Sequence, residues 1–197
     1  ARELSLIQIA AIRDALDDST EIEIFVHGAM CISYSGRCLL SNYLSGRDSN
    51  RGECVQACRW RYEIREAERG GDFLTLEEDK YGSYILNSKD LNLIRHLKEL
   101  INAGVNSFKI EGRMKSEYYV GTVVNSYRRA LEDIEQGREF DESLYEELYK
   151  TSHRKFTAGF LFDGKDTQNY QSSVAQSDYK FTASVLGYDK NSGLKVM

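Results

Sequence analysis

Strands and helices alternate through the middle of the chain, and this alternation restricts the fold more than any other feature. The alternating, β-branched run at 21–28 predicts a strand, and the apolar run at 105–113 predicts a second, buried strand. A short strand at 83–87 leads into a helix expected over about 89–103, and a longer helix is expected from about 116 to 136. Because alternation with short connections is typical of parallel βαβ units, we expect an α/β fold.

The flanking segments predict further elements. Apolar residues at helical spacing predict a helix over 4–16, with Ser5 as its N-cap. The amphipathic stretch 141–153 predicts another helix, capped by Asp141. In the tail, 180–197, two apolar runs flank a DKNSG turn, which indicates a pair of strands.

All the cysteines fall within twenty-eight residues of a long polar segment, 27–69, which we expect to be an irregular loop with short helical turns. They are spaced Cys-x6-Cys-x15-Cys-x3-Cys, at positions Cys31, Cys38, Cys54 and Cys58. Reduced structural thiols, disulfides and a shared metal are the three interpretations. The clustering favours a soft metal, either zinc or an iron–sulfur cluster. The x6 spacing fits only half of the usual zinc pattern, so the spacing leaves the identity of the metal open.

Other candidate catalytic groups follow the predicted strands. His27 comes at the end of the first, and Glu111 and Arg113 at the end of the second. Active-site groups of parallel α/β folds gather at this end of the strands. The alternatives are a structural histidine and a Glu–Arg pair that closes the strand.

Cations and aromatic side chains surround the second strand end. Candidate residues for binding an anionic substrate or an RNA backbone are Lys109, Lys115 and Tyr118. Arg128 and Arg129 lie further along the next helix, where a solvated face with ion pairs explains them.

Composition and motifs exclude several classes of protein. The formal net charge of −5 argues against a protein whose whole surface binds nucleic acid, although a local basic patch would still bind RNA. No apolar run approaches the roughly 20 residues that span a bilayer, and no secretory signal is visible, so we expect a cytoplasmic protein without a membrane. Neither a serine-protease triad nor a phosphate-binding glycine loop is recognisable.

Several blocks resemble the collagenase-like peptidase family, peptidase family U32. The most specific is EIFVHGAMCISYSGRCLLS at 23–41, and NRGECVQACRW at 50–60, ILNSKDL at 85–91 and FKIEGRMKS at 108–116 follow in the family's order. HRKFTAGF and QNYQSS, within 153–173, resemble the family's stretch before its C-terminal β module. The blocks are most similar to the tRNA uridine 5-hydroxylation branch.

The resemblance implies a fold. It predicts the later part of a (β/α) TIM-like barrel over 1–139, which contains the cysteine-rich loop 27–69. A helical and extended connection over 140–175 and the start of a small β domain over 176–197 would follow. An incomplete barrel has an unpaired edge, so a chain of this kind would need to dimerise or swap.

The resemblance also implies a cofactor. By position, Cys31, Cys38 and Cys54 match the cysteines that hold a four-iron cluster in relatives. A further cysteine often follows SKDL in relatives, where this chain has Asn92. Cys58 matches a cysteine that many members possess, so the fourth ligand is Cys58 or is absent.

Three functions follow from the resemblance. The first is iron–sulfur-dependent hydroxylation of a tRNA wobble uridine, with prephenate, a small carboxylate, as co-substrate. The second is a peptidase acting on protein, in which Cys31 or another thiol forms a nucleophile–base pair with His27, or a thiolate-bound metal activates water. The third is a fragment of either that is inactive alone.

Overall fold

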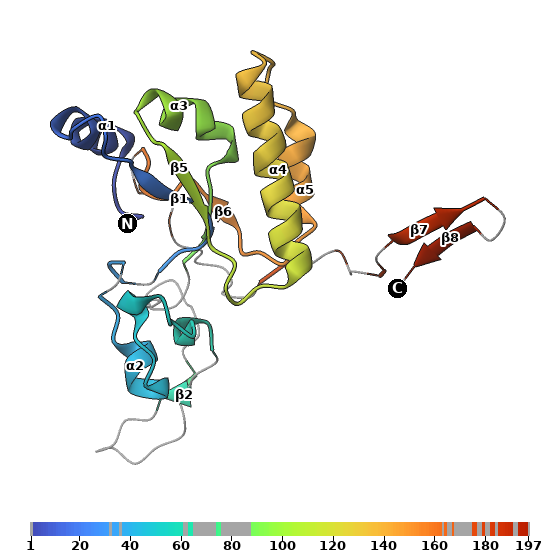
Figure 1. The fold of residues 1–197 in the computed structure, drawn as a ribbon. Helices are drawn as coiled ribbons and strands as arrows, with labels where there is room; N and C mark the ends of the chain where they lie inside the picture. Colours follow the sequence, from blue (N-terminus) through green and yellow to red (C-terminus); the bar gives the residue numbers. More distant parts are fainter. Residues whose placement is uncertain are drawn as a thin grey trace.

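A computed structural model describes residues 2–31, 33–35, 37–60, 63, 64, 74, 75 and 88–162, and beyond these 164, 167, 175, 176, 179, 182, 183, 185–190 and 193–196. A mixed four-stranded sheet lies at its centre (Figure 1). The strands are β1 (Glu23–Ala29), β4 (Asp90–Asn92), β5 (Ser107–Ile110) and β6 (Phe156–Thr157), in the order β5-β1-β4-β6.

The pairing in this sheet confirms one expectation and corrects another. β1 and β5 are parallel, as expected for two strands joined through a helix. β4 runs antiparallel to β1, with Asn92 opposite His27. The predicted start of the helix, at about residue 89, is therefore wrong. Asp90–Asn92 is strand, and the helix α3 spans only Leu97–Asn102. The strand expected at 83–87 lies outside the described residues.

The helices confirm most of the sequence expectations. Ser5 caps α1 through a capping box with Gln8, and the Asp141 side chain caps α5. Ser116 caps α4, which is the helix expected from about 116 to 136. The main helices are α1 (Leu6–Ala15), α2 (Leu40–Ser45), α3 (Leu97–Asn102), α4 (Glu117–Glu135) and α5 (Glu142–Tyr149). None of the described helices is long and apolar enough to cross a membrane.

The core lies between the sheet and α4. Val26 of β1 is buried with Val123 and Tyr127 of α4, and α5 packs on α4 through Leu144 and Leu148. Figure 1 shows α1 at the opposite flank of the sheet from the α4–α5 pair. Burying these apolar side chains supplies the main stabilisation of the fold.

The cysteine-rich segment leaves the end of β1 and lies below the sheet in Figure 1. It contains α2 and two single 3-10 turns, η1 (Ser49–Arg51) and η2 (Ala57–Arg59), as expected for an irregular loop with short helical turns. Two further antiparallel pairs are β2 (Glu63–Ile64) with β3 (Leu74–Thr75), and β7 (Val185–Asp189) with β8 (Gly193–Val196). The second pair confirms the two strands expected in the tail.

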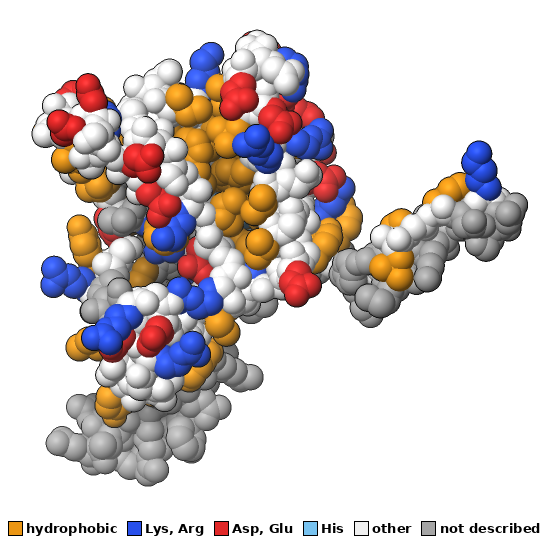
Figure 2. All heavy atoms as spheres, in the orientation of Figure 1, with side chains coloured by type: hydrophobic (Ala, Val, Ile, Leu, Met, Phe, Trp, Pro, Cys, Tyr) orange, Lys and Arg blue, Asp and Glu red, His pale blue; other side chains and the backbone are white. Residues whose placement is uncertain are grey.

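Apolar side chains gather beside β5, an edge strand of the described sheet. Figure 2 shows them between α3 and α4. Exposed apolar residues of these two helices include Ile101, Val120 and Val124. An exposed apolar surface next to an open edge marks a contact surface. That a second copy of the chain covers it stays a prediction.

Candidate metal centre and its cationic rim

All four cysteines line one cavity of about 390 Å³ below the sheet. Each is a free thiol and half-buried. The structure thus brings together the four residues that the spacing singled out. Among the described residues, no three His, Cys, Asp or Glu side chains stand close enough to form a metal-binding group. The thiols surround a hollow and do not adopt a coordination geometry.

The local fold aims backbone donors at two of the sulfurs. The Leu40 amide donates to the Cys38 Sγ at 3.4 Å, and the Gln56 amide donates to the Cys54 Sγ at 3.3 Å. Amide donors stabilise negative charge on sulfur, and hydrogen bonds of this kind tune thiolate-bound clusters. The donor set therefore fits a soft cation or an iron–sulfur cluster.

The turns that place these sulfurs have special backbone conformations. Gly46 and Gly52 end α2 and η1 in the left-handed region, and Gln56 adopts φ 55°, the one positive φ of a non-glycine residue among those described. Ser41, which is buried, accepts a hydrogen bond from the Val55 amide and ties the two cysteine pairs together. A strained non-glycine residue beside a ligand cavity is common at functional sites.

Arg59 is a functional candidate that the sequence analysis missed. Its Nη2 donates to the Met30 carbonyl at 3.0 Å, and its Nη1 lies 3.8 Å from the Cys58 Sγ. Burial raises the pKa of the Cys58 thiol, and the Arg59 guanidinium opposes that rise. Its position next to Cys58 in the sequence is the signal that could have indicated it.

Arg2 is a second missed residue. Its guanidinium lies 3.7 Å from the centroid of the Phe25 ring, and its Nη2 lies 3.9 Å from the Glu111 Oε2. Burial lowers the pKa of Arg2, and Glu111 and Cys31 act against that lowering. Arg2 is the second residue of the sequence, and no pattern in the residues around it indicated that its side chain would be buried.

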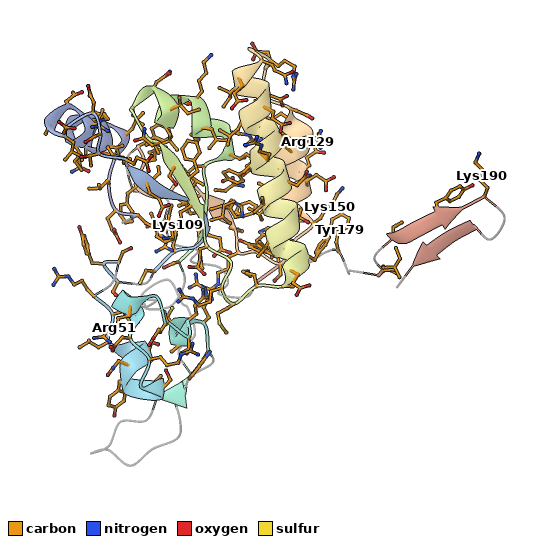
Figure 3. All side chains as sticks on the ribbon, viewed as in Figure 1. Arg51, Lys109, Arg129, Lys150, Tyr179 and Lys190 are labelled. Carbon is orange, nitrogen blue, oxygen red and sulfur yellow. The ribbon has the colours of Figure 1, made fainter. Side chains whose placement is uncertain are left out.

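The predicted residues at the end of β5 divide into two groups. Lys109, Glu111 and Arg113 line the cavity, and the Arg113 amide donates to the Glu111 Oε1 at 2.9 Å. Lys109 also pairs with Glu23 at 3.2 Å. Figure 3 shows Lys109 above the segment that carries Arg51, where Figure 2 shows Lys and Arg side chains gathered.

Lys115 and Tyr118 lie outside the lining of this cavity. The Lys115 Nζ donates to the Ser152 carbonyl at 2.6 Å and lies 4.9 Å from the centroid of the Tyr119 ring, and burial lowers the Lys115 pKa. Tyr118 is exposed on the first turn of α4. Further along α4, Arg128 and Arg129 form ion pairs at the surface, which agrees with a solvated helix face.

His27 is buried in β1, away from the cavity lining. The Tyr127 hydroxyl donates to the Val26 carbonyl at 2.8 Å and accepts from the Leu93 amide at 3.1 Å. Because its one hydrogen is committed to Val26, the His27 Nδ1, 3.3 Å away, must be the donor to Tyr127. The His27 Nε2 then carries a lone pair, with no partner among the described residues. Burial lowers the His27 pKa to about 3.

Asn92 also lies outside the cavity lining. Its Oδ1 accepts from the Ile94 amide at 3.2 Å and lies 3.3 Å from the Tyr127 hydroxyl. Asn92 therefore belongs to the polar network around His27. Among the residues that the structure describes, Cys58 is the fourth thiol of the cavity.

The chain belongs to peptidase family U32, whose sequence profile matches residues 1–171. It is 42% identical over 219 residues to the tRNA hydroxylation protein P of Escherichia coli, covering 90% of this chain and 48% of that protein. It is 44% identical over 138 residues to a 23S rRNA 5-hydroxycytidine synthase of Escherichia coli, covering 70% of this chain and 20% of the relative. A collagenase of Porphyromonas gingivalis is 33% identical over 191 residues, covering 89% of this chain and 45% of the relative.

The chain spans about half the length of the first of these relatives. No solved structure matches it.

Proposed function

We propose that this chain is part of an iron–sulfur enzyme that hydroxylates a pyrimidine in RNA, with a tRNA wobble uridine as target and prephenate as co-substrate. The observation that carries the proposal is the cavity lined by four free thiols in a chain similar to RNA hydroxylation proteins. The sheet would be the later part of a (β/α) barrel, with the cavity at its mouth.

The residues of the cavity have distinct roles in this proposal. A four-iron cluster on the four cysteines would supply electron transfer. Lys109 and Arg113 would hold the carboxylate of the co-substrate or an RNA phosphate, and Glu111 would fix the Arg113 backbone through its hydrogen bond. Lys115 and Tyr118 would contact RNA outside the cavity, and His27 would act through the buried network that it shares with Tyr127.

The charge of the cysteine-rich segment supports RNA as the partner. Residues 31–60 contain four arginines and two carboxylates, whereas the whole chain has a net charge of −5. A local excess of cations next to the cavity would draw the RNA backbone toward the thiols and away from the acidic remainder of the chain.

A peptidase receives less support from the geometry. A thiol nucleophile needs a base within hydrogen-bond reach. None of the three histidines is among the described residues that line the cavity, and the His27 Nδ1 is committed to Tyr127. The similarity to a collagenase is the observation that keeps this function as the second candidate.

The test uses the full-length protein, purified without oxygen, and a strain from which its gene is deleted. We expect iron and sulfide in about equal amounts, as in a four-iron cluster. We also expect the hydroxylated uridine to be missing from tRNA of the deletion strain and to return with the wild-type gene but not with Cys31→Ser. Unchanged tRNA in the deletion strain, together with cleavage of gelatin that Cys31→Ser abolishes, would overturn the proposal in favour of the peptidase.

A further inference from the structure

A second cavity, of about 300 Å³, is also lined by Cys31. It shares Arg2, Met30 and Cys31 with the cysteine-lined cavity. A ligand in the second cavity would therefore adjoin one of the four thiols. Its volume is at the lower end of the range for small-molecule pockets.

The second cavity is nearly neutral, in contrast to the first. Among the described residues that line it, Arg2 and Glu3 are the charged pair. The Glu3 carboxylate accepts hydrogen bonds from the Ser35 amide at 2.7 Å and from the Arg2 amide at 2.8 Å. The first cavity has four cations around it, Arg2, Arg59, Lys109 and Arg113, against the one carboxylate of Glu111. An anion therefore fits the first cavity, and a neutral ligand fits the second.

Two aromatic side chains line the second cavity without being buried by the protein. Tyr34 is 59% exposed and Phe160 is 36% exposed. Aromatic faces left open beside a pocket suit a planar ring that stacks on them. Stacking of a base on such a side chain is a main source of affinity for unpaired nucleotides.

Ser88 adds a buried hydroxyl that has no hydrogen-bond partner among the described residues. Ser88 is 2% exposed and lines the second cavity. Its backbone is held in place, since the Ser88 carbonyl accepts from the Arg154 Nη1 at 3.3 Å. A buried hydroxyl without a partner is costly, and a ligand that both donates and accepts would satisfy it.

We propose that the second cavity receives the pyrimidine base of the RNA substrate, turned out of its stack, with Ser88 bonded to the base edge and Tyr34 and Phe160 against its face. The inference rests on the proposed function, because an enzyme that modifies a base in RNA must bring that base out to its reactive group. A pyrimidine is planar, neutral and carries both donors and acceptors, which matches the lining. The adjoining Cys31 would place the base next to the metal centre.

Photocrosslinking tests the location of the base without requiring turnover. An RNA stem-loop with 5-iodouridine at the target position is bound to the anaerobically purified full-length protein and irradiated, and the crosslinked peptide is identified by mass spectrometry. We expect the crosslink at Tyr34 or Phe160. A crosslink elsewhere in the protein, or none, overturns the inference.

Steady-state kinetics tests the contribution of the lining. We expect Ser88→Ala and Phe160→Ala each to lower kcat/KM for the RNA about tenfold or more, with the iron content unchanged. Tyr43→Ala is the matched control, because Tyr43 is 84% exposed in the same segment as Tyr34 and does not line the cavity; it should stay within about twofold. Variants that raise KM for the carboxylate co-substrate and leave that for RNA unchanged would assign the cavity to the co-substrate and overturn the inference.

The two proposals fail separately. A crosslink at Phe160 or Tyr34 in a protein that does not hydroxylate RNA leaves the base pocket standing and removes the proposed activity. Normal hydroxylation by wild-type protein, Ser88→Ala and Phe160→Ala alike removes the pocket and leaves the activity.

Discussion

The Arg59 Nη2 lies 3.5 Å from the Oδ1 of Asp90, a buried carboxylate in β4. The other oxygen of Asp90 accepts a hydrogen bond from the Arg154 amide at 3.0 Å, so the carboxylate is fixed in position. Arg59 also bonds the Met30 carbonyl and approaches the Cys58 sulfur. One guanidinium therefore joins the last cysteine of the cavity, the residue before the first cysteine, and the central sheet.

We expect Arg59→Gln to lower the free energy of unfolding by about 3 kcal/mol, because it leaves the buried Asp90 charge without this partner. Urea denaturation near neutral pH measures the change. Arg51→Gln is the matched control: its pair with Asp48, at 3.7 Å, is exposed and should contribute less than about 1 kcal/mol. Equal effects of the two substitutions would show that the Arg59–Asp90 pair does not anchor the segment.

The fourth ligand position was expected either at Cys58 or at the position that Asn92 occupies in place of a cysteine, and of these two residues Cys58 lines the cavity. If the proposed cluster is present, we expect Cys58→Ser in the full-length protein to contain much less iron than the wild type after anaerobic purification, since Cys58 lines the cavity. Asn92→Ser should retain iron, because the Asn92 side chain bonds within the His27 network. Iron analysis and the visible absorption of the cluster measure both. Iron loss in Asn92→Ser alone would contradict this assignment.

Gly28 fixes the approach of β1 to Glu111. It adopts φ 108°, and a Cβ at this position would lie 2.4 Å from the Glu111 carbonyl oxygen. We expect Gly28→Ala to lower the free energy of unfolding by about 3 kcal/mol or more, through backbone strain and displacement of Glu111. Thermal or urea unfolding measures it.

Gly46→Ala controls for strain alone. Gly46 also has a positive φ, of 68°, but a Cβ there meets no atom within 4 Å. It should lower the free energy of unfolding by about 1 kcal/mol. If Gly28→Ala lowered the free energy of unfolding no more than Gly46→Ala does, the displacement of Glu111 would contribute nothing to the loss of stability.

Local patterns were sufficient to predict α1, α4 and α5. Ser5, Ser116 and Asp141 each accept a backbone amide at a helix start, and this bond depends only on residues within three positions. β4 was not predictable in this way. Asp90–Asn92 is strand because it pairs with β1 on one side and β6 on the other, and such pairing depends on segments more than sixty residues away.

The candidate site shows the same division. The clustering of the cysteines predicted a shared metal site; the four thiols line one cavity, and the metal stays a prediction. Arg2 and Arg59 were missed because the burial of a long cationic side chain depends on which carboxylates and rings the fold brings to it. Glu111 and Arg113 were found because the ends of parallel strands meet at one edge of a sheet.

His27, a candidate catalytic residue in the sequence, is buried among aromatic rings. Its ring lies against those of Tyr119, Tyr127 and Phe156, with centroids 5.4 to 6.0 Å apart. Burial among these rings, with Lys115 and His153 as further causes, lowers the His27 pKa to about 3. The ring is therefore neutral at physiological pH, and its Nε2 is an acceptor.

This pKa predicts how stability depends on pH. An unfolded histidine has a pKa near 6.5, so between about pH 6.5 and about pH 3 the unfolded state binds a proton that the folded state does not. The free energy of unfolding should therefore fall by about 1.4 kcal/mol per pH unit from this group as the pH drops below about 6.5, and should be independent of it above. Urea denaturation between about pH 7 and about pH 5 measures the slope, which carboxylates also affect. His27→Gln should flatten the slope by about this amount. A wild-type slope in His27→Gln would show that His27 titrates normally in the folded protein.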